Sequence, residues 1–328
     1  MIQFIVRRLL LMIPTIFAIS IVVFIIIQLP PGDFLTTMVS AMSSQGESVN
    51  QAALDALKDQ YGLGQPLYVQ YFKWMSNIIL HGNFGQSFEY NQPVSALIGS
   101  RLALTIVISV VSLFLTWIIA FPIGIYSAVR KYSAGDYIFT FISFIGLAIP
   151  EFMIALVLLY VSFKYFGQSV GGLFSPQYVD APWNLRKVGD LFQHMWIPVV
   201  IIGAAHTAGL VRIMRANLLD ELNRPYVVTA RAKGLTERKL LLKYPVRLAL
   251  NPFISTVGWV LPAILSGEAI IGVVLSLPTE GPLLLHALQS QDMYLAGSLL
   301  LLLTILTVVG TLISDILLAW LDPRIRYR

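Results

Sequence analysis

Six long apolar stretches, almost free of charge, constrain the fold of this chain more than any other feature. A helix that crosses the hydrocarbon core of a bilayer needs about 20 mostly apolar residues. Only three charged residues, all of them acids, interrupt the six stretches. The sequence therefore predicts an all-α integral membrane protein with six transmembrane helices. The stretches are residues 9–29, 102–129, 137–163, 195–211, 248–277 and 294–321.

The composition argues against an ordinary soluble domain. Hydrophobic residues make up 57% of the chain and charged residues only 12%, whereas a soluble domain carries about 25% charged residues. A chain this poor in charge lacks the polar side chains to cover itself in water, which leaves the bilayer as its solvent. The absence of cysteine excludes disulfides, thiolate metal sites and cysteine nucleophiles.

The loops and chain ends outside the six stretches carry unequal numbers of Lys and Arg. An even number of spans puts both termini on one side, and cytoplasmic loops carry an excess of Lys and Arg. Sixteen of the 22 Lys and Arg lie at the two ends of the chain and in the loops at 130–131 and 212–247. Both termini are therefore predicted to be cytoplasmic. The net charge of +5 is explained by these loops, so no nucleic acid partner is expected.

The loops divide the chain into four parts. Residues 1–29 form an N-terminal transmembrane helix, and its apolar stretch is too long for a cleaved signal peptide, so we expect it to be retained. Residues 30–100 form a small extra-cytoplasmic subdomain between the first and second helices. Residues 101–321 form a core of five transmembrane helices, and residues 322–328 form a cytoplasmic tail.

Two amphipathic segments of the extra-cytoplasmic subdomain are predicted to be helical. Residues 48–61 begin with Ser48 as an N-cap and place apolar side chains at helical spacing. Residues 65–80 are rich in aromatic side chains. This second helix either lies along the membrane surface or packs inside the subdomain, and the sequence leaves both possibilities open.

The cytoplasmic loop between the fourth and fifth stretches has strong local signals. Pro225 ends the helix that enters from the membrane, and Gly234 stops the helix that follows. A second short helix then runs up to Pro245. The expected element is a helix–glycine–helix segment, rich in Lys and Arg, that exposes the small residues Ala230 and Ala232. On charge alone, an ordinary positive cytoplasmic loop is the better explanation.

The order of residues in this segment is more informative than its charge. The run Tyr226-Val-Val-Thr-Ala-Arg-Ala-Lys-Gly-Leu235, followed by Tyr244-Pro-Val-Arg247, resembles the coupling motif of permeases from ATP-driven (ABC-type) importers. The version is that of the dipeptide/oligopeptide permease family, and the likeness to its B-type subunit covers nearly the whole chain. Further matching runs are Arg7-Arg8-Leu9-Leu10, Leu29-Pro-Pro-Gly-Asp33, Tyr61-Gly-Leu-Gly-Gln-Pro66, Phe84-Gly-Gln-Ser87, Gln92-Pro-Val94 and Arg101-Leu-Ala-Leu-Thr105.

The resemblance implies a fold, a set of partners and a location. The fold is the type I ABC importer permease fold, in a multi-pass protein of the bacterial cell (inner) membrane. The partners are a homologous permease subunit, two cytoplasmic ABC ATPase subunits that carry the ATP and magnesium, an extra-cytoplasmic solute-binding protein and membrane lipid. The solute is a di- or oligopeptide, with oligosaccharides or other small solutes as the alternative. The chain itself then binds no cofactor or metal and catalyses no reaction.

The resemblance also implies which residues receive the motion of the ATPase. In the family, the segment that corresponds to residues 221–245 is a surface helix that docks in a groove of the ATPase subunit. Small residues allow close approach there, and the glycine allows a sharp exit. Val228, Thr229 and Ala230 stand where the broader importer motif begins Glu-Ala-Ala. The coupling residues in this chain are Tyr226, Thr229, Ala230, Arg231, Ala232, Lys233, Gly234 and Leu235.

Ionisable residues inside the apolar stretches are candidates for a translocation pathway, because charge is costly there and usually faces a cavity or a partner. Glu151 follows Pro150 in the third stretch, His206 lies in the fourth and Glu268 in the fifth. The alternative is a structural polar contact between helices. As proton carriers, Glu151 and Glu268 would instead fit a proton-coupled secondary transporter.

Motifs of enzymes are missing from the sequence. The phosphate-binding loop Gly-x4-Gly-Lys-Ser/Thr is absent, so ATP must be hydrolysed on another chain. The four histidines are scattered along the sequence, and the His-Glu-x-x-His motif is absent. Paired acids are missing as well, so an intramembrane hydrolase has little support.

Overall fold

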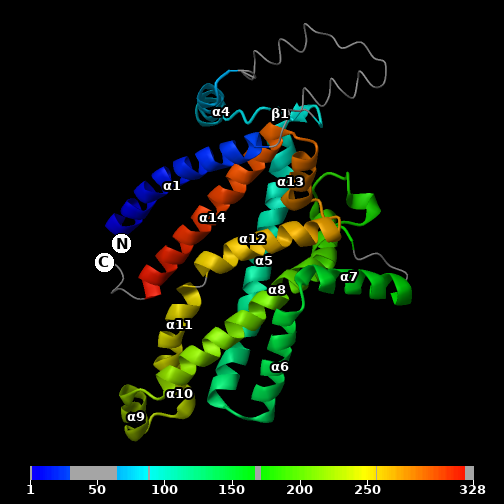
Figure 1. Ribbon diagram of the computed structural model, residues 1–328. Coiled ribbons are helices and arrows are strands. Elements are labelled where there is room, and N and C mark those ends of the chain that lie inside the picture. Colours follow the sequence, from blue (N-terminus) through cyan, green and yellow to red (C-terminus); the bar gives the residue numbers. More distant parts are fainter. Residues whose placement is uncertain (1, 30–64, 88, 167–170, 256, 322–328) are drawn as a thin grey trace. The chain divides into compact units, whose positions relative to one another are not determined.

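The computed structural model describes residues 2–29, 65–87, 89–166, 171–255 and 257–321, and these residues are almost entirely helical (Figure 1). The chain divides into two compact units. The first unit comprises Met1–Leu9, Thr105–Pro278 and Thr307–Arg328, and the second comprises Leu10–Leu104 and Thr279–Leu306.

Among the described residues, four helices are long and apolar enough to cross a membrane. They contain the first, second, fourth and sixth of the predicted apolar stretches. The four helices are α1 (Ile2–Gln28), α5 (Val94–Val129), α8 (Leu185–Leu222) and α14 (Met293–Leu321). A fifth span results if α6 (Ala134–Ala148) and α7 (Glu151–Val161) together count as one.

The third apolar stretch, predicted as a single span, is broken at Pro150, where the helix axis bends by 95°. Proline disfavours a helical backbone in the residue before it, and Ile149 is extended at φ −94° and ψ 122°. α7 starts again at Glu151 and passes into a π-helical turn over Ser162–Phe166. Glu151 therefore lies at the break of this stretch, as the first residue of α7.

The fifth apolar stretch is divided between α11 (Pro245–Ser255) and α12 (Val257–Val274). The division falls at residue 256, outside the described residues. Neither helix is among those long and apolar enough to span a bilayer by themselves. Pro245 begins α11, as its fixed backbone angle allows at the first helical position.

In the first unit, α6, α11 and α12 all pack against α8 (Figure 1). Asn184 caps the start of α8 by accepting a hydrogen bond from the backbone N–H of Lys187 at 2.8 Å. A short 3-10 helix, Pro176–Tyr178, precedes it. Several large apolar side chains of α8 are wholly buried in this unit: Ile201, Ile202, Leu210, Met214 and Leu218.

Two glycines bring α5 and α8 close together. A Cβ atom at Gly124 of α5 would lie 2.6 Å from the Cβ of Met214, a distance that real Cβ atoms essentially never show. At Gly203 of α8, a Cβ would lie 3.2 Å from the hydroxyl oxygen of Thr116. The missing side chains therefore set the separation of the two helices.

An ion pair fixes the start of α6 to α8. Arg215 donates two hydrogen bonds to the buried carboxylate of Asp136, one from Nε and one from Nη2, each at 2.8 Å. The backbone N–H of Tyr132 donates to the same carboxylate at 2.9 Å. Two-point pairing of this kind fixes geometry as well as distance. It holds the part of α8 that leads into the following loop.

In the second unit, a hydrophobic core joins α1, α4 (Leu67–His81), α5, α13 (Glu280–Gln289) and α14. α4 confirms the predicted helix over residues 65–80. Its Tyr71 packs edge-on against Phe24 of α1 and hydrogen-bonds with Ser20 at 2.8 Å. The other predicted helix, residues 48–61, lies outside the described residues.

A short antiparallel hairpin, β1 (Gln86–Ser87) with β2 (Gln92–Pro93), is a small departure from the all-helical prediction. It is anchored to the start of α14 through Asp292. The carboxylate of Asp292 accepts hydrogen bonds from the hydroxyl of Ser87 at 2.5 Å and from the backbone N–H of Leu295 at 3.1 Å.

Candidate functional site

The loop between α8 and α11 folds into a helical hairpin of residues 225–243 (Figure 1). Its two helices are α9 (Pro225–Ala232) and α10 (Glu237–Lys243). Pro225 occupies the first turn of α9, where its missing N–H leaves no hydrogen bond unmade. The predicted division of this loop into two short helices is confirmed.

Gly234 makes the turn between the two helices. Its φ of +79° lies in the left-handed region, which glycine adopts without steric cost. The N–H of Leu235 donates to the carbonyl of Ala230 at 3.4 Å, and the N–H of Gly234 donates to that of Arg231 at 3.0 Å. This is the bonding pattern of a helix that ends in a Schellman motif, so the predicted helix stop is confirmed.

The 225–243 hairpin has a small hydrophobic core of its own, formed by Val227, Ala230 and Leu240. Tyr226, Leu235 and Tyr244 pack around these three residues. The sequence predicted that Ala230 would be exposed, and this was wrong: its exposed fraction is 8%. Ala230 lies three residues after Val227, on the same face of α9, and α10 folds back over that face.

Polar contacts hold the hairpin at its turn and at its base. Across the turn, Nε of Arg231 lies 2.6 Å from Oε1 of Glu237, and this hydrogen bond lowers the pKa of the Glu237 carboxyl. The contribution of the pair is therefore complete at neutral pH and is lost as the pH falls through that lowered pKa. At the base, the Tyr226 hydroxyl donates to Glu221, and burial together with this bond raises the pKa of Tyr226.

The predicted coupling residues therefore fall into two groups. Tyr226, Ala230 and Leu235 pack on the hairpin's own core. The others are exposed, and they are Thr229, Arg231, Ala232, Lys233 and Gly234. Val228 adds an apolar side chain that is 58% exposed on α9. The hairpin thus presents a basic surface with small and apolar side chains on a framework that is already folded.

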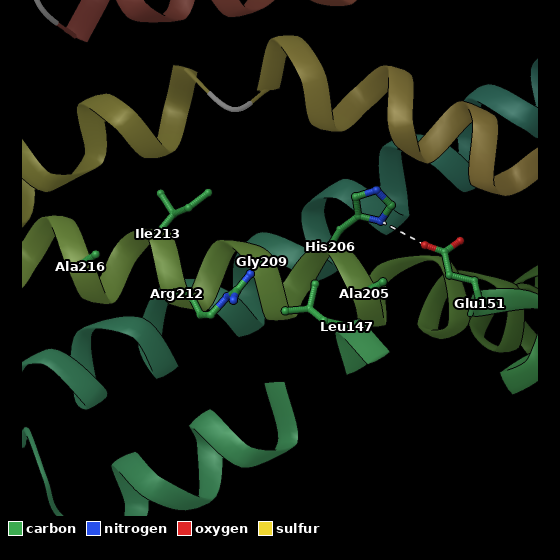
Figure 2. Close-up of a pocket in the computed structure, with 8 residues that line it drawn as sticks. All are labelled: Leu147, Glu151, Ala205, His206, Gly209, Arg212, Ile213 and Ala216. Atoms are coloured by element: carbon green, nitrogen blue, oxygen red, sulfur yellow. Dashed lines mark ion pairs between the residues drawn. The ribbon is translucent and has the colours of Figure 1, made fainter. Parts of the chain in front are cut away.

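A cavity of about 570 Å³ lies along α8 in the first unit (Figure 2). Its walls are apolar except for three ionisable side chains from α7 and α8. The lining residues are Leu147, Glu151, Ala205, His206, Gly209, Arg212, Ile213 and Ala216. Two of the three predicted pathway residues, Glu151 and His206, are therefore brought together on one cavity.

Glu151 and His206 point toward each other on the wall of the cavity (Figure 2). Nδ1 of His206 lies 3.6 Å from Oε1 of Glu151 and 2.9 Å from the carbonyl oxygen of Ile202. Because a carbonyl only accepts hydrogen bonds, these partners assign the proton to Nδ1. Nε2 then lies on the side of the ring away from Glu151 (Figure 2).

α12 approaches the other oxygen of the same carboxylate. A Cβ atom at Gly267 would lie 2.6 Å from Oε2 of Glu151, so any side chain at this position would displace Glu151. The third predicted pathway residue, Glu268, is the next residue of α12, but it is only 1% exposed and does not line the cavity. Glu268 is therefore not one of the residues that line the cavity with Glu151 and His206.

Arg212 lines the same cavity, and sequence reasoning used it only to mark the end of an apolar stretch. Its guanidinium carbon lies 5.7 Å from the centre of the Phe144 ring of α6. Gly209 follows His206 by three residues on α8, and Arg212 and Ile213 follow Gly209 by three and four, which is the spacing of one helix face. A search for this spacing around His206 would have found Arg212.

Two family models match the chain. Residues 120–327 match the model described as "Binding-protein-dependent transport system inner membrane component". Residues 1–109 match the model of the N-terminal part of such membrane components. The chain belongs to this family.

Several curated relatives match the chain along its whole length. The oligopeptide transport system permease protein AppB of Bacillus subtilis (strain 168) is 37% identical over 329 residues, covering 100% of both chains. OppB of Haemophilus influenzae, an oligopeptide transport system permease protein, is 32% identical, and the glutathione transport system permease protein GsiC of Escherichia coli (strain K12) is 30% identical. Both of these also cover 100% of each chain.

The fold has a counterpart among solved structures. A chain of the MetNI methionine ABC transporter, solved in inward facing conformations, superposes with a TM-score of 0.53 at 17% identity. The match covers 69% of this chain and 96% of that chain. The resemblance to dipeptide/oligopeptide permeases of ABC importers is confirmed by the family models and relatives. The chain is a multi-pass membrane permease subunit and not an enzyme, and ATP hydrolysis belongs to separate subunits.

Proposed function

We propose that this chain forms half of the translocation pathway of a peptide importer in a bacterial inner membrane. A homologous permease supplies the other half, two cytoplasmic ATPase subunits supply the energy, and an extra-cytoplasmic binding protein delivers the solute. The observation that carries the proposal is the exposed, folded 225–243 hairpin between α8 and α11.

The hairpin is the element that the ATPase subunit grips. Ala232 is exposed and has no side chain beyond Cβ, so it lets a groove approach the backbone of α9 closely. Arg231 and Lys233 supply positive charge beside it. Because the hairpin has its own core, it can transmit a displacement to α8 and α11 as a unit. Closure of the two ATPases would then move these helices and switch the pathway between its outward- and inward-facing forms.

The cavity beside Glu151 and His206 is the part of the pathway that this chain contributes. Ionisable side chains within membrane segments usually face a water-filled cavity or a partner, and these two do line a cavity. Arg212 on the same wall favours a charged solute such as a peptide over a neutral oligosaccharide. The names of the relatives, which are oligopeptide and glutathione permeases, support the same choice.

The proposed topology has six spans with both termini in the cytoplasm. α1, α5, α8 and α14 are four of them, the bent pair α6 and α7 is the third in chain order, and α11 with α12 makes the fifth. The uneven distribution of Lys and Arg supports this orientation. It places the 225–243 hairpin in the cytoplasm and residues 30–100 outside as a small subdomain.

Substitution of Gly234 tests the coupling role. Nothing lies within 4 Å of a Cβ at this position, so only the backbone restricts the choice of residue. In Gly234→Ile, the left-handed conformation at φ +79° costs about 1–2 kcal/mol, which should disturb the exit from α9. We expect normal membrane insertion, retained ATP hydrolysis by the complex, and strongly reduced peptide uptake into proteoliposomes.

Gly234→Asn is the matched control. Asparagine tolerates the left-handed region better than other residues with a side chain, so this variant should keep most of the uptake while adding comparable bulk. Uptake that stays normal in Gly234→Ile, with ATP hydrolysis still coupled to it, would count against the proposal.

A further inference from the structure

The cavity carries an unusual electrostatic arrangement. Glu151 begins α7, and among the described residues its carboxylate makes one ion-pair contact, with His206 at 3.6 Å. It accepts no hydrogen bond from any described residue, although an ionised carboxylate has room for about four. A carboxylate that is 20% exposed and sits in an apolar wall is costly without donors. The open cavity is where such donors can enter.

Arg212 is the complementary group on the same cavity. Within the described residues its guanidinium lies over the ring of Phe144 and faces no carboxylate. Its five N–H donors suit a carboxylate, which they bind in a planar two-point arrangement. The cavity therefore holds a carboxylate, Glu151, and a guanidinium, Arg212, that do not pair with each other.

The positions of Glu151 and Arg212 on the wall of the cavity indicate the length of ligand that fits between them. Glu151 lies beside His206, and Arg212 follows six residues later on α8. Six residues of α-helix rise about 9 Å. An extended peptide spans at most about 3.3–3.6 Å per residue, so a peptide of two or three residues is about as long as this rise.

The wall between Glu151 and Arg212 offers few specific contacts to the side chains of a ligand. It consists of small and aliphatic residues, among them Ala205, Gly209 and Ile213. The volume of about 570 Å³ lies within the range of roughly 300–1,000 Å³ that small-molecule sites occupy. Such a cavity can bind the two charged termini, which all short peptides share, without selecting among their side chains.

We propose that this cavity is a binding station for short zwitterionic peptides, in which Glu151 binds the terminal ammonium and Arg212 binds the terminal carboxylate. The inference rests on the proposed import function and adds its specificity: two to three residues, free at both ends. Longer peptides engage one end only.

Photoaffinity labelling of the complete complex tests this station. The probe is a tripeptide with free ends and a central diazirine side chain, applied without binding protein to the transporter in nanodiscs. Mass spectrometry should locate the label on cavity residues such as Leu147 or Ile213. N-acetylation of the probe should weaken labelling of the wild-type protein about tenfold to a hundredfold, the range expected for loss of a charge-assisted contact. C-terminal amidation should have an effect of the same size.

The variants complete a cycle with these probes. Glu151→Gln should weaken labelling by the free peptide as N-acetylation does, and N-acetylation should then weaken it no further. Arg212→Gln should behave in the same way toward the amidated probe. Asp180→Asn and Arg186→Gln remove exposed charges of the same types outside the cavity and should change nothing.

The outcomes separate this inference from the proposed function. If blocked and free peptides label the cavity equally, or if no label reaches it while the same complex imports the peptide with its binding protein, the station does not exist and the import function stands. If the complex imports no peptide at all, the proposed function itself falls. Because the probes test the unmodified protein, misfolding of a variant cannot decide the result.

Discussion

Glycines in the first unit show how differently single residues act in this fold. Gly124 is required for packing, since a Cβ there would lie 2.6 Å from that of Met214. Gly209 is different, because it lines the cavity and nothing lies within 4 Å of a Cβ at this position. A side chain at Gly209 would therefore point into open space that we assign to the solute.

Gly209→Leu should block the cavity without harming the fold. Leucine favours the helix interior over glycine by up to about 1 kcal/mol, so the thermal stability of the purified complex should be unchanged or higher. Steric overlap with the solute should cost about as much as overpacking a core, roughly 1–3 kcal/mol, which lowers peptide affinity about tenfold or more. Uptake into proteoliposomes measures the loss.

Gly189→Leu is the control for this experiment. Gly189 lies on the same helix, has nothing within 4 Å of a Cβ, and does not line the cavity. Uptake should match the wild type. Equal uptake by the Gly189→Leu and Gly209→Leu variants would mean that the cavity is not part of the pathway.

At the scale of residues, the sequence could predict that Glu151 and His206 line a cavity, because an ionisable group in an apolar stretch is conspicuous. It could not predict that Glu268 is buried away from the cavity, because that depends on how α12 is rotated against its neighbours. Arg212 was missed because a charged residue at the end of an apolar stretch looks like a boundary. Its position on the face of His206 shows its place in the site.

At the scale of elements, local signals predicted the 225–243 hairpin well. Pro225, Gly234 and Pro245 each restrict the backbone whatever surrounds them. α9 and α11 begin at the two prolines, and α9 and α10 end two residues before Gly234 and Pro245. The fold-back of α10 onto α9 places Leu240 against Val227 and Ala230, so the burial of Ala230 was not predictable from α9 alone. The 95° bend at Pro150 exceeds the kink that a proline usually produces within a helix.

Two alanines of the hairpin separate folding from docking. Ala230→Leu places a large side chain in the Val227–Leu240 core and should destabilise the hairpin by about 1–3 kcal/mol. Ala232→Leu enlarges the exposed surface and should leave the hairpin folded. Hydrogen exchange of residues 225–243 should therefore speed up in the Ala230→Leu variant and stay unchanged in the Ala232→Leu variant.

Attachment of the ATPase subunits should be affected by Ala232→Leu, although folding of the hairpin is not. We expect the Ala232→Leu variant to lose ATPase subunits during purification, because the larger side chain holds the groove away from α9. If its hairpin stays folded and its ATPase subunits remain fully bound and active, Ala232 does not lie in the docking surface.

At the scale of the whole molecule, hydropathy alone predicted a helical membrane protein, because the cost of exposing charge or open backbone to lipid is large. The number of spans is harder to predict, since a bent pair such as α6 and α7 and a divided stretch such as α11 and α12 change the count without changing composition. The order of residues after Pro225 identified the family, because a specific run of residues carries information that hydropathy does not.

The cytoplasmic, ATPase-gripped position of the 225–243 hairpin is the central claim, and labelling of a single cysteine tests it most directly. The chain contains no cysteine, so Ala232→Cys creates one reactive site, and Asp180→Cys provides a control in the loop before α8. A membrane-impermeant maleimide should label position 232 in inside-out vesicles stripped of ATPase subunits, and label position 180 only in right-side-out vesicles. Reassembly with the ATPase subunits should protect position 232. Labelling of position 232 from outside, or equal labelling with and without bound ATPase subunits, would contradict the account.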